Sequence, residues 1–499
     1  MLLALVLLFL AISFLYFRSL YRKYAFAIEM WMHGQRKIAC FTYVKTSTHE
    51  ERLGLRATQN RRLKLAFGID NSLTTDSLPV HLAFLKRARE LLRRDRDWTE
   101  LFRVAEGFVA SERDNAIMSA TNDGGGRMSR LKLAQLVRCM VLSVVLFDSF
   151  GVDPAKTPRN VLVTITEEIN RQWLSSKQRP DEVTQSAELN KAIADLRIKS
   201  PFSDSKGALL SPEEVLGLLM PQYETLWRVV LLTFVSAYYH QLQTVNDTLQ
   251  RTANVPGCLG NPSEEKEALK LAKEGLRLFP SNKHLYRTLP TNHTQTTPTT
   301  LSADITTLHR HPIIWGIDSA LFRPSRFDDL PHPPHTQPPN NHTYRRRASA
   351  SSSALTPLQQ AAYIPFSIDP HKCPAASNAF GERMVVTLVV ALGRALGDFR
   401  GQGWIAVRPP AAAVRPVLDR DSVGASESVA RAGLDVWGLQ PDREQLDARD
   451  NSGRLGVVWG LLGMVAPEWV FGRNIRRVWA LPTGRDEMEE WVWEVKRGR

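Results

Sequence analysis

Apolar residues recur three and four positions apart along most of the chain, which is the period of helices that bury one face. The longest such pattern begins at Ser211, where Ser, Pro and Glu occupy the cap, first and third positions of a helix, and it extends to about Gln243. Pro221 interrupts this helix and frees the carbonyl oxygen of Gly217, which leaves a gap where water or a diatomic ligand could sit. Further helices are predicted at Leu78–Arg94, Met128–Phe150, Pro158–Lys177, Ser263–Phe279 and Ala379–Phe399.

The first apolar stretch differs from the others because it carries no charge. Met1 to Phe17 is uncharged, and basic residues follow it between Arg18 and Lys23. As a helix this stretch spans roughly 25 Å, enough to cross a bilayer when its flanks help. A cleaved signal peptide would carry its positive charges before the apolar stretch, not after it. Residues 1–20 are therefore predicted to be a transmembrane anchor, with residues 24–499 on the cytosolic side.

Two polar stretches lack any apolar period. Residues 290–300 and 331–362 are rich in Thr, Pro, His, Asn and Ser. Such a composition buries too little apolar surface to offset the entropy lost on ordering, so both stretches are predicted to be mobile surface loops.

Composition narrows the class of partner. The chain has 64 Lys and Arg against 51 Asp and Glu, and a net charge of +13 suits an acidic lipid surface or an acidic protein. Nucleic acid is not expected, because no block of Lys and Arg is interleaved with aromatic residues. The four cysteines form no C-x-x-C pair and no spacing typical of a disulfide framework.

Two short motifs predict a buried network of charges. Glu274 and Arg277 form E-x-x-R on a predicted helix, where residues three apart face the same side. Pro324, Arg326 and Phe327 form P-x-R-F, whose arginine is able to bind the Glu274 carboxylate. Because an unpaired buried charge is costly, the Glu and the two Arg side chains should act together.

A third motif surrounds Cys373. The segment from Phe366 to Cys373, which includes His371, precedes a long apolar helix. The thiol is therefore expected near a helix N-terminus, whose positive end favours the thiolate. Taken alone, a cysteine in a loop is more often structural than catalytic.

The order E-x-x-R, P-x-R-F and F-x-x-G-x-(R/H)-x-C-x-G resembles the signature series of the cytochrome P450 family. The resemblance covers roughly residues 213–399 together with the anchor. It implies the cytochrome P450 fold, which is mainly α with a small β region (α+β), preceded by an N-terminal transmembrane helix. It also implies one haem b (iron protoporphyrin IX), with Cys373 as the axial ligand of the iron and His371, Arg287 and Phe366 as further haem-binding residues. Glu274, Arg277 and Arg326 would form the family's structural network.

Within the long helix, the segment Pro221-Gln-Tyr-Glu-Thr is similar to the family's oxygen-binding stretch A-G-x-(D/E)-T. An acid beside an alcohol is able to relay protons, which makes Glu224 and Thr225 candidate catalytic residues. The alternative is that Thr225 bonds back to the Pro221 carbonyl and that Glu224 is solvated. His81 lies near a position where the family often has Trp, and it is interpreted as a surface histidine.

By this resemblance the protein is expected to be a monooxygenase of the endoplasmic reticulum membrane, single-pass and with a cytosolic catalytic domain. It would insert one oxygen atom from O2 into a lipophilic small molecule, with electrons from NADPH-cytochrome P450 reductase. One alternative is a catalytically impaired haem-binding or scaffold protein, because Asp369 and Ala375 stand where the family has glycine. Asp tolerates left-handed backbone angles, so the turn is expected to survive. The other alternative is a haem-thiolate isomerase or dehydratase that needs no reductase.

Overall fold

A computed structural model describes most of the chain outside its polar loops and its C-terminal tail. The described residues are 2–40, 48–122, 129–237, 262–288, 300–316, 318–328, 355–369, 371–396, 405–408, 485–489 and 491–495. The predicted loop at 290–300, apart from residue 300, and residues 331–354 of the second predicted loop lie outside these ranges.

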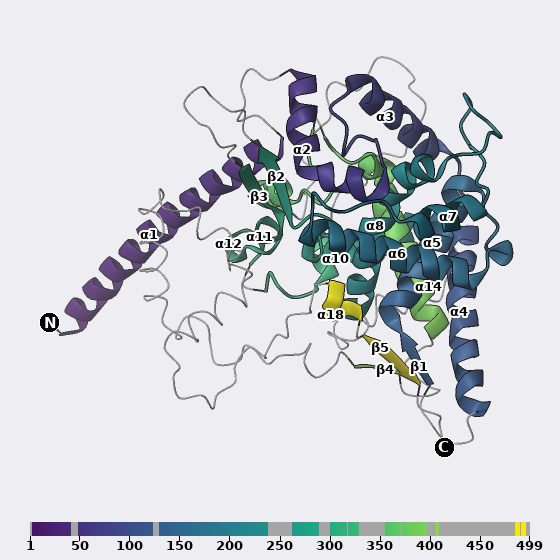
Figure 1. The fold of residues 1–499 in the computed structure, drawn as a ribbon. Coiled ribbons are helices and arrows are strands. Elements are labelled where there is room, and N and C mark those ends of the chain that lie inside the picture. The colour runs from purple at the N-terminus through teal and green to yellow at the C-terminus, as the bar shows by residue number, and fades with distance from the viewer. Residues whose placement is uncertain are drawn as a thin grey trace, which may run out of the picture.

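Helices make up most of the described chain (Figure 1). The longer ones are α1 (Leu2–Ala39), α2 (His49–Phe67), α3 (Leu78–Arg93), α4 (Trp98–Asn122), α5 (Leu133–Phe150), α6 (Arg159–Gln178), α7 (Ala187–Asp195), α8 (Pro212–Val235), α10 (Pro262–Leu278) and α14 (Phe380–Leu396). The short ones are η1 (Pro154–Lys156), α11 (Ile305–Arg310), α12 (Pro312–Trp315), η4 (Pro324–Phe327), α13 (Pro357–Ala362), η5 (Pro374–Ala379) and α18 (Arg485–Glu489).

The described strands form two small antiparallel sheets. One sheet has the order β1-β5-β4 and consists of β1 (Ser129–Lys132), β4 (Ile405–Arg408) and β5 (Val492–Val495), with Leu131 and Val407 on either side of Trp493. The other is a hairpin of β2 (His284–Thr288) and β3 (Thr300–Asp304). The predicted fold class, mainly α with a small β region, is confirmed.

All six helices predicted from the apolar period are present; the predicted ends at Gln243 and Phe399 lie outside the described residues. The predicted helix at Met128–Phe150 begins only at Leu133, because the preceding residues form β1 against β5. The partner strand lies more than 300 residues away, so no local pattern reveals it. The continuous helix α8 contains Pro221 and keeps the capping box predicted at Ser211.

The prediction of a loop over 331–362 was wrong at its C-terminal end. Residues Pro357–Ala362 form α13, which Thr356 and Gln359 begin with a capping box. Leu355 and Ala362 are buried there. Two apolar positions were enough to fix a short helix that composition alone did not indicate.

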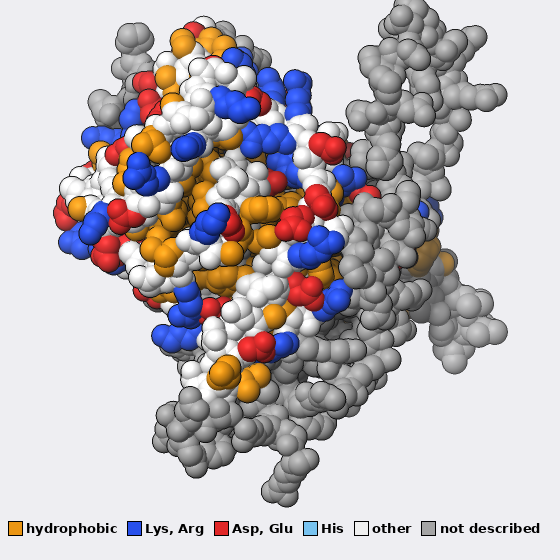
Figure 2. Space-filling model, turned by 90° about the vertical axis from the view of Figure 1, so that its right-hand side faces the viewer, with side chains coloured by type: hydrophobic (Ala, Val, Ile, Leu, Met, Phe, Trp, Pro, Cys, Tyr) orange, Lys and Arg blue, Asp and Glu red, His pale blue; other side chains and the backbone are white. Residues whose placement is uncertain are grey.

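The core lies between α4, α5, α8, α10 and α14. Among the described helices, α5 alone is long and apolar enough to cross a membrane, but 83% of it is buried inside the protein, which is typical of a core helix. On the face shown in Figure 2, apolar side chains lie in a hollow, with basic and acidic side chains around it. The excess of positive charge is thus mixed with acidic groups on this face and forms no block of one sign.

Helix α1 is continuous from residue 2 to residue 39, through the predicted anchor and beyond it. Its C-terminal part docks on the hairpin and on α12, where Ile28, Met32 and Ala39 are buried in a second core with Trp315. Its N-terminal part projects away from the rest of the protein (Figure 1). The side chains of residues 1–8 and 10, which belong to the predicted anchor, lie outside the described residues.

Helices α8 and α10 approach each other closely at Gly275. A Cβ atom at this position would lie 2.1 Å from the Thr233 hydroxyl oxygen and 2.9 Å from its methyl carbon. The Thr233 side chain is itself fully buried, so it has no room to yield. Glycine between Glu274 and Leu276 therefore sets the distance between the two helices.

We expect Gly275→Ala to lower the free energy of unfolding by about 1–3 kcal/mol, because the added methyl group overpacks this contact. Thermal unfolding measures the effect. The matched control is Gly107→Ala in α4, where no atom lies within 4 Å of the added Cβ and helix propensity should raise stability by up to about 1 kcal/mol. Equal shifts of Tm in both variants would contradict the close contact.

Candidate functional site

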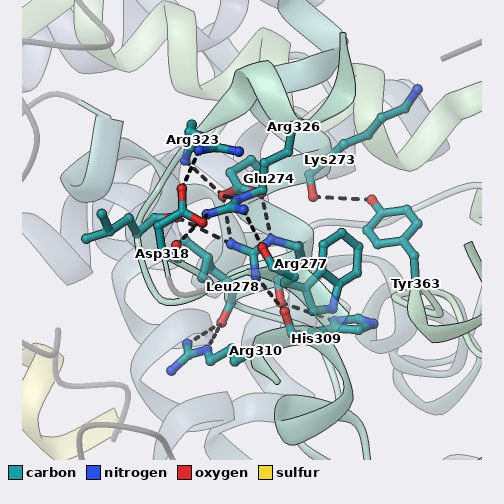
Figure 3. Close-up of polar contacts among 12 residues, drawn as sticks. Lys273, Glu274, Arg277, Leu278, His309, Arg310, Asp318, Arg323, Arg326 and Tyr363 are labelled. Atoms are coloured by element: carbon teal, nitrogen blue, oxygen red, sulfur yellow. Dashed lines mark hydrogen bonds and ion pairs between the residues drawn. The ribbon is translucent and has the colours of Figure 1, made fainter. Parts of the chain in front are cut away.

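A buried ion pair on α10 forms the centre of the predicted charge network (Figure 3). The Arg277 guanidinium donates from Nε to Oε2 of Glu274 at 2.7 Å and from Nη2 to Oε1 at 2.7 Å. Neither side chain has any exposed surface. A fork of two parallel hydrogen bonds is the strongest form of this pair, and in the absence of water it fixes both side chains.

The P-x-R-F turn completes this network, as the spacing predicted. Arg326 lies on η4 with its Nε 3.4 Å from Oε1 of Glu274, and it donates from Nη1 to the Trp315 carbonyl at 2.7 Å. The backbone N–H of Arg323 donates to the same Glu274 oxygen at 2.8 Å. One carboxylate thus binds two guanidinium groups and one backbone amide, and it joins α10 to the segment before η4.

His309 extends the network toward the cysteine loop (Figure 3). Burial and the nearby Arg277 lower the pKa of His309 to about 3, so its ring is neutral at physiological pH. Its Nδ1 lies 3.1 Å from the Arg277 carbonyl oxygen, and its Nε2 accepts a hydrogen bond from the backbone N–H of Ile364 at 3.0 Å. A proton on Nδ1 satisfies both contacts. The ion pair therefore positions the start of the segment that leads to Cys373.

The cysteine loop is held by its own backbone. The N–H of Cys373 donates to the Phe366 carbonyl at 2.8 Å, and Cys373 then caps η5, which leads into α14. The Phe366 ring lies against Gly381, where a Cβ atom would come within 2.7 Å of two ring carbons. The left-handed angle that the sequence suggested for Asp369 occurs instead at Ser367, with φ of 61°. The strained residue of the turn is therefore two positions earlier than expected.

Cys373 is an exposed residue whose thiol is nevertheless partly enclosed by protein atoms. Solvent reaches the residue, yet burial raises the pKa of its thiol. The backbone N–H of Ala375 and the positive charge of Arg56 oppose this rise. The thiol is therefore accessible to a ligand while protein atoms surround it on its other sides.

Basic side chains gather beside this thiol. Arg56 donates from Nη1 to Nδ1 of His371 at 3.4 Å, and the rings of His49, His81 and His371 lie with centroids 5.3 to 6.2 Å apart. Arg287 is buried in β2, and its positive charge lowers the pKa of both Arg56 and His371. The expectation that His81 lies on the surface was wrong, because it is 3% exposed. We call Arg56, Arg287, His49, His81 and His371 the basic cluster.

The two guanidinium groups carry the positive charge of the basic cluster, whereas its His371 and His81 rings are neutral at physiological pH. Burial and the neighbouring cations lower the pKa of His371 to about 2 and that of His81 to about 4. Burial and Arg287 lower the pKa of Arg56 to about 10. Within the described part of the chain, no three His, Cys, Asp or Glu side chains are placed to hold a metal ion. The electrostatics of the cluster therefore match an anion.

The neighbouring residues Thr225 and Glu224 have different environments: Thr225 lines a cavity, and Glu224 pairs with an arginine. Thr225 lines a cavity of about 200 Å³ between α8 and the segment after α10, whereas Glu224 does not line it. Glu224 is 3% exposed and forms an ion pair with Arg485 of α18, so it is not solvated. Within the described residues the Thr225 hydroxyl makes no bond back to the Pro221 carbonyl. The structure brings Thr225 to a cavity, but it does not bring Glu224 beside it.

The gap predicted beside Pro221 is filled. The Gly217 carbonyl that Pro221 leaves without a helical partner accepts a hydrogen bond from Nδ2 of Asn71 at 2.8 Å, and both groups are buried. The prediction of a gap for water or a diatomic ligand at this carbonyl was therefore wrong. A side chain from the loop after α2 satisfies it.

Sequence reasoning missed several of these partners. Arg56 and His49 lie on the ordinary polar helix α2, and Asn71 lies in a turn, so no motif marks them. Arg485 lies in the tail beyond Arg400, where the sequence shows no motif. Arg56 lies seven residues after His49 and therefore on the same face of α2, but many surface helices contain such a pair.

Comparison with known proteins shows similarity of structure only. No protein-family model matches the chain, and no curated protein matches it. The chain is similar to a 6-coordinated cytochrome P450 from Thermus thermophilus, with 17% identity, a TM-score of 0.40 and coverage of 70% of this chain and 80% of that one. It is also similar to the haem domain of a cytochrome P450DA mutant, with 14% identity, a TM-score of 0.41 and coverage of 72% and 77%.

A third similar structure is a protein from another strain of Thermus thermophilus, with 18% identity and a TM-score of 0.35. The match covers 62% of this chain and 66% of that one, just under two thirds of its length. All three are cytochrome P450 structures. With identities and TM-scores this low, the chain's own residues carry the case for its function.

We expect Glu274→Ala to lower the free energy of unfolding by about 3–5 kcal/mol, because it leaves the buried Arg277 charge without its carboxylate. The control is Glu100→Ala, which removes the partner of Arg103 in an exposed pair and should cost no more than about 1 kcal/mol. Thermal or denaturant unfolding of both variants checks the contrast. A loss of similar size in the two variants would show that the network does not hold the fold.

Proposed function

We propose that the protein is a haem-thiolate monooxygenase of the cytochrome P450 family, with Cys373 as the ligand of the haem iron. The observation that carries the proposal is a solvent-accessible thiol at the start of η5, with the basic cluster beside it. The buried network of Glu274, Arg277 and Arg326 supports it, because His309 joins that network to the cysteine loop.

The residues present fit a haem group. Haem carries two carboxylates, and the basic cluster offers two guanidinium groups and three imidazoles next to the thiol. Nε2 of His49 and Nδ1 of His81 are buried without a hydrogen-bond partner among the described residues. Bound carboxylates would offset the repulsion between Arg56 and Arg287 and accept hydrogen bonds from such nitrogens. Arg56, Arg287 and His371 would therefore hold the haem carboxylates, and the Phe366 ring would shape the thiol side.

When bound, a thiolate-ligated haem supplies the activation of molecular oxygen for insertion of one oxygen atom into a substrate. This chain's contribution is to bind, orient and supply protons. The Thr225 hydroxyl faces the cavity and is able to accept a proton and pass it on at its Oγ1 atom. Glu224 is held by Arg485, so a role in proton delivery requires that this ion pair opens.

Membrane attachment is part of the proposal and rests on α1. Its described part exposes many large apolar side chains, a surface that water disfavours and a bilayer would cover. These are Phe9, Ile12, Phe14, Leu15, Tyr16, Phe17, Leu20, Tyr21, Phe26 and Met30. We propose a single-pass protein of the endoplasmic reticulum membrane with a cytosolic catalytic domain. The net charge of +13 supports docking of an acidic flavoprotein, NADPH-cytochrome P450 reductase, as the electron donor.

A second candidate function is a haem-binding scaffold without turnover, which the residues Asp369 and Ala375 in place of glycine suggested. Asp369 adopts no left-handed angle, and the Ala375 N–H hydrogen-bonds to the thiol. Neither substitution therefore blocks the loop, and we favour the enzyme. A third candidate, an isomerase or dehydratase, would differ only in needing no reductase.

We expect the reduced, carbon monoxide-treated protein to show the Soret band of a thiolate-ligated haem, and Cys373→Ser to abolish it. The control is Cys40→Ser, which changes a half-buried thiol at the end of α1 and should leave the band in place. Absorbance spectroscopy of the three proteins makes the comparison. A wild-type protein without this band, or a Cys373→Ser variant that keeps it, would refute the proposal. Dependence of turnover on NADPH and reductase then separates a monooxygenase from an isomerase.

We expect Arg56→Gln to lower haem affinity roughly 10- to 100-fold, because a hydrogen bond to a charged group contributes about 1.5–3 kcal/mol. Transfer of haem to apomyoglobin measures the rate of loss. Arg61→Gln is the matched control, since Arg61 lies exposed on the same helix. If both variants release haem at the wild-type rate, the basic cluster does not hold the haem carboxylates.

A further inference from the structure

The cavity beside Thr225 carries an excess of positive charge. Three cations line it, namely Arg228 from α8, Lys283 before β2 and Arg310 at the end of α11. No Asp or Glu is among the described residues that line it. The wall between them is apolar and includes Val229, Leu232 and Phe279. An apolar wall with cations suits a molecule that has both an apolar part and an anionic group.

Arg228 differs from the other cations of this cavity because a buried nitrogen of its guanidinium has no hydrogen-bond partner among the described residues. Burial lowers its pKa, and its Nε is buried without a hydrogen-bond partner. Within the described part of the chain, neither a carboxylate nor a carbonyl oxygen accepts a hydrogen bond from its guanidinium. Arg310 differs, because its Nε donates to the Leu278 carbonyl at 3.1 Å.

Several other buried arginines among the described residues have a carboxylate partner. Arg96 pairs with Asp148 at 2.7 Å, Arg277 pairs with Glu274, and Arg485 pairs with Glu224. A buried charge without a partner costs several kcal/mol, and proteins seldom keep one that serves only the fold. The Arg228 guanidinium therefore has room for an anion that the described residues do not supply.

A second polar atom in the same cavity lacks a partner. The Thr306 hydroxyl oxygen is buried without a hydrogen bond among the described residues, and Thr306 lines the cavity with Arg228. A hydroxyl donates well to a carboxylate oxygen. The cavity thus offers one guanidinium and one hydroxyl to the same ligand. Thr225 lies three residues before Arg228 on one face of α8, so the ligand would lie next to the proposed proton donor.

We propose that this cavity binds the carboxylate of an apolar carboxylic acid, with Arg228 as the anchoring cation and Thr306 as an additional donor. The proposal rests on the proposed monooxygenase for its claim that the acid is the substrate. The haem carboxylates are the competing anions. They have their own partners in the basic cluster, which lies on α2, α3, β2 and the cysteine loop, whereas Arg228 lies on α8.

The test measures binding of octanoate and of octanamide, its neutral counterpart of equal shape, to the full-length, haem-containing protein by titration calorimetry. We expect octanoate to bind about 10- to 100-fold more tightly than octanamide. Arg228→Met should remove this preference, and Arg228→Lys should restore part of it. Arg61→Met, an exposed arginine on α2, is the control and should leave the preference unchanged. Equal binding of the two probes to the wild-type protein would overturn the proposal.

Two further readouts keep the variant informative. Without ligand, Arg228→Met should unfold at the wild-type temperature or higher, because it removes an uncompensated buried charge. A clear fall in Tm would show that Arg228 has a partner within the protein and would overturn the proposal. A fall in haem content would overturn it as well, because Arg228 would then hold a haem carboxylate. A protein that lacks the haem-thiolate spectrum but still prefers octanoate would refute the proposed function and keep the carboxylate site.

Discussion

The buried carboxylate of Glu274 is the interaction on which the position of the cysteine loop depends. It has no exposed surface, so its charge must be balanced by protein groups alone. Arg277 belongs to the same helix, whereas Arg326 and the Arg323 amide belong to a turn about 50 residues later. By binding both, the carboxylate holds this turn against α10. His309 then carries this constraint to Ile364, at the start of the cysteine loop. The position of the thiol thus follows from the balance of one charge.

Buried arginines in this protein fall into two groups. Those with carboxylate partners, such as Arg277 and Arg96, join helices and segments of the core. Arg56 and Arg228 lack such partners among the described residues; Arg228 lines a cavity, and Arg56 lies close to the Cys373 thiol. Burial lowers the pKa of both, which means that the protein bears the cost of keeping them charged. The first group joins parts of the core, and the second marks the two places where we propose that anions bind.

Sequence reasoning predicted what depends on local pattern. Apolar period and caps gave the long helices, and the spacing of Glu274, Arg277 and Arg326 gave the network, because a buried charge needs partners in fixed positions. Contacts between distant segments were beyond it. Nothing local links Ser129–Lys132 to Val492–Val495, or Asn71 to the Gly217 carbonyl. His81 was misjudged for the same reason, since its burial depends on the loop around His371.

The cysteine loop forms its turn without glycine at residues 369 and 375. Glycine is favoured where the backbone angle φ is positive. In this turn the positive φ occurs at Ser367 and not at Asp369, so residue 369 does not need to be glycine. The close approach that does need glycine lies at Gly381, where the Phe366 ring leaves no room for a Cβ atom. The Cys373 N–H still reaches the Phe366 carbonyl, and the Ala375 N–H still reaches the thiol. Apart from the charge of Arg56, the groups that act on the sulfur are backbone groups, which Asp369 and Ala375 leave in place.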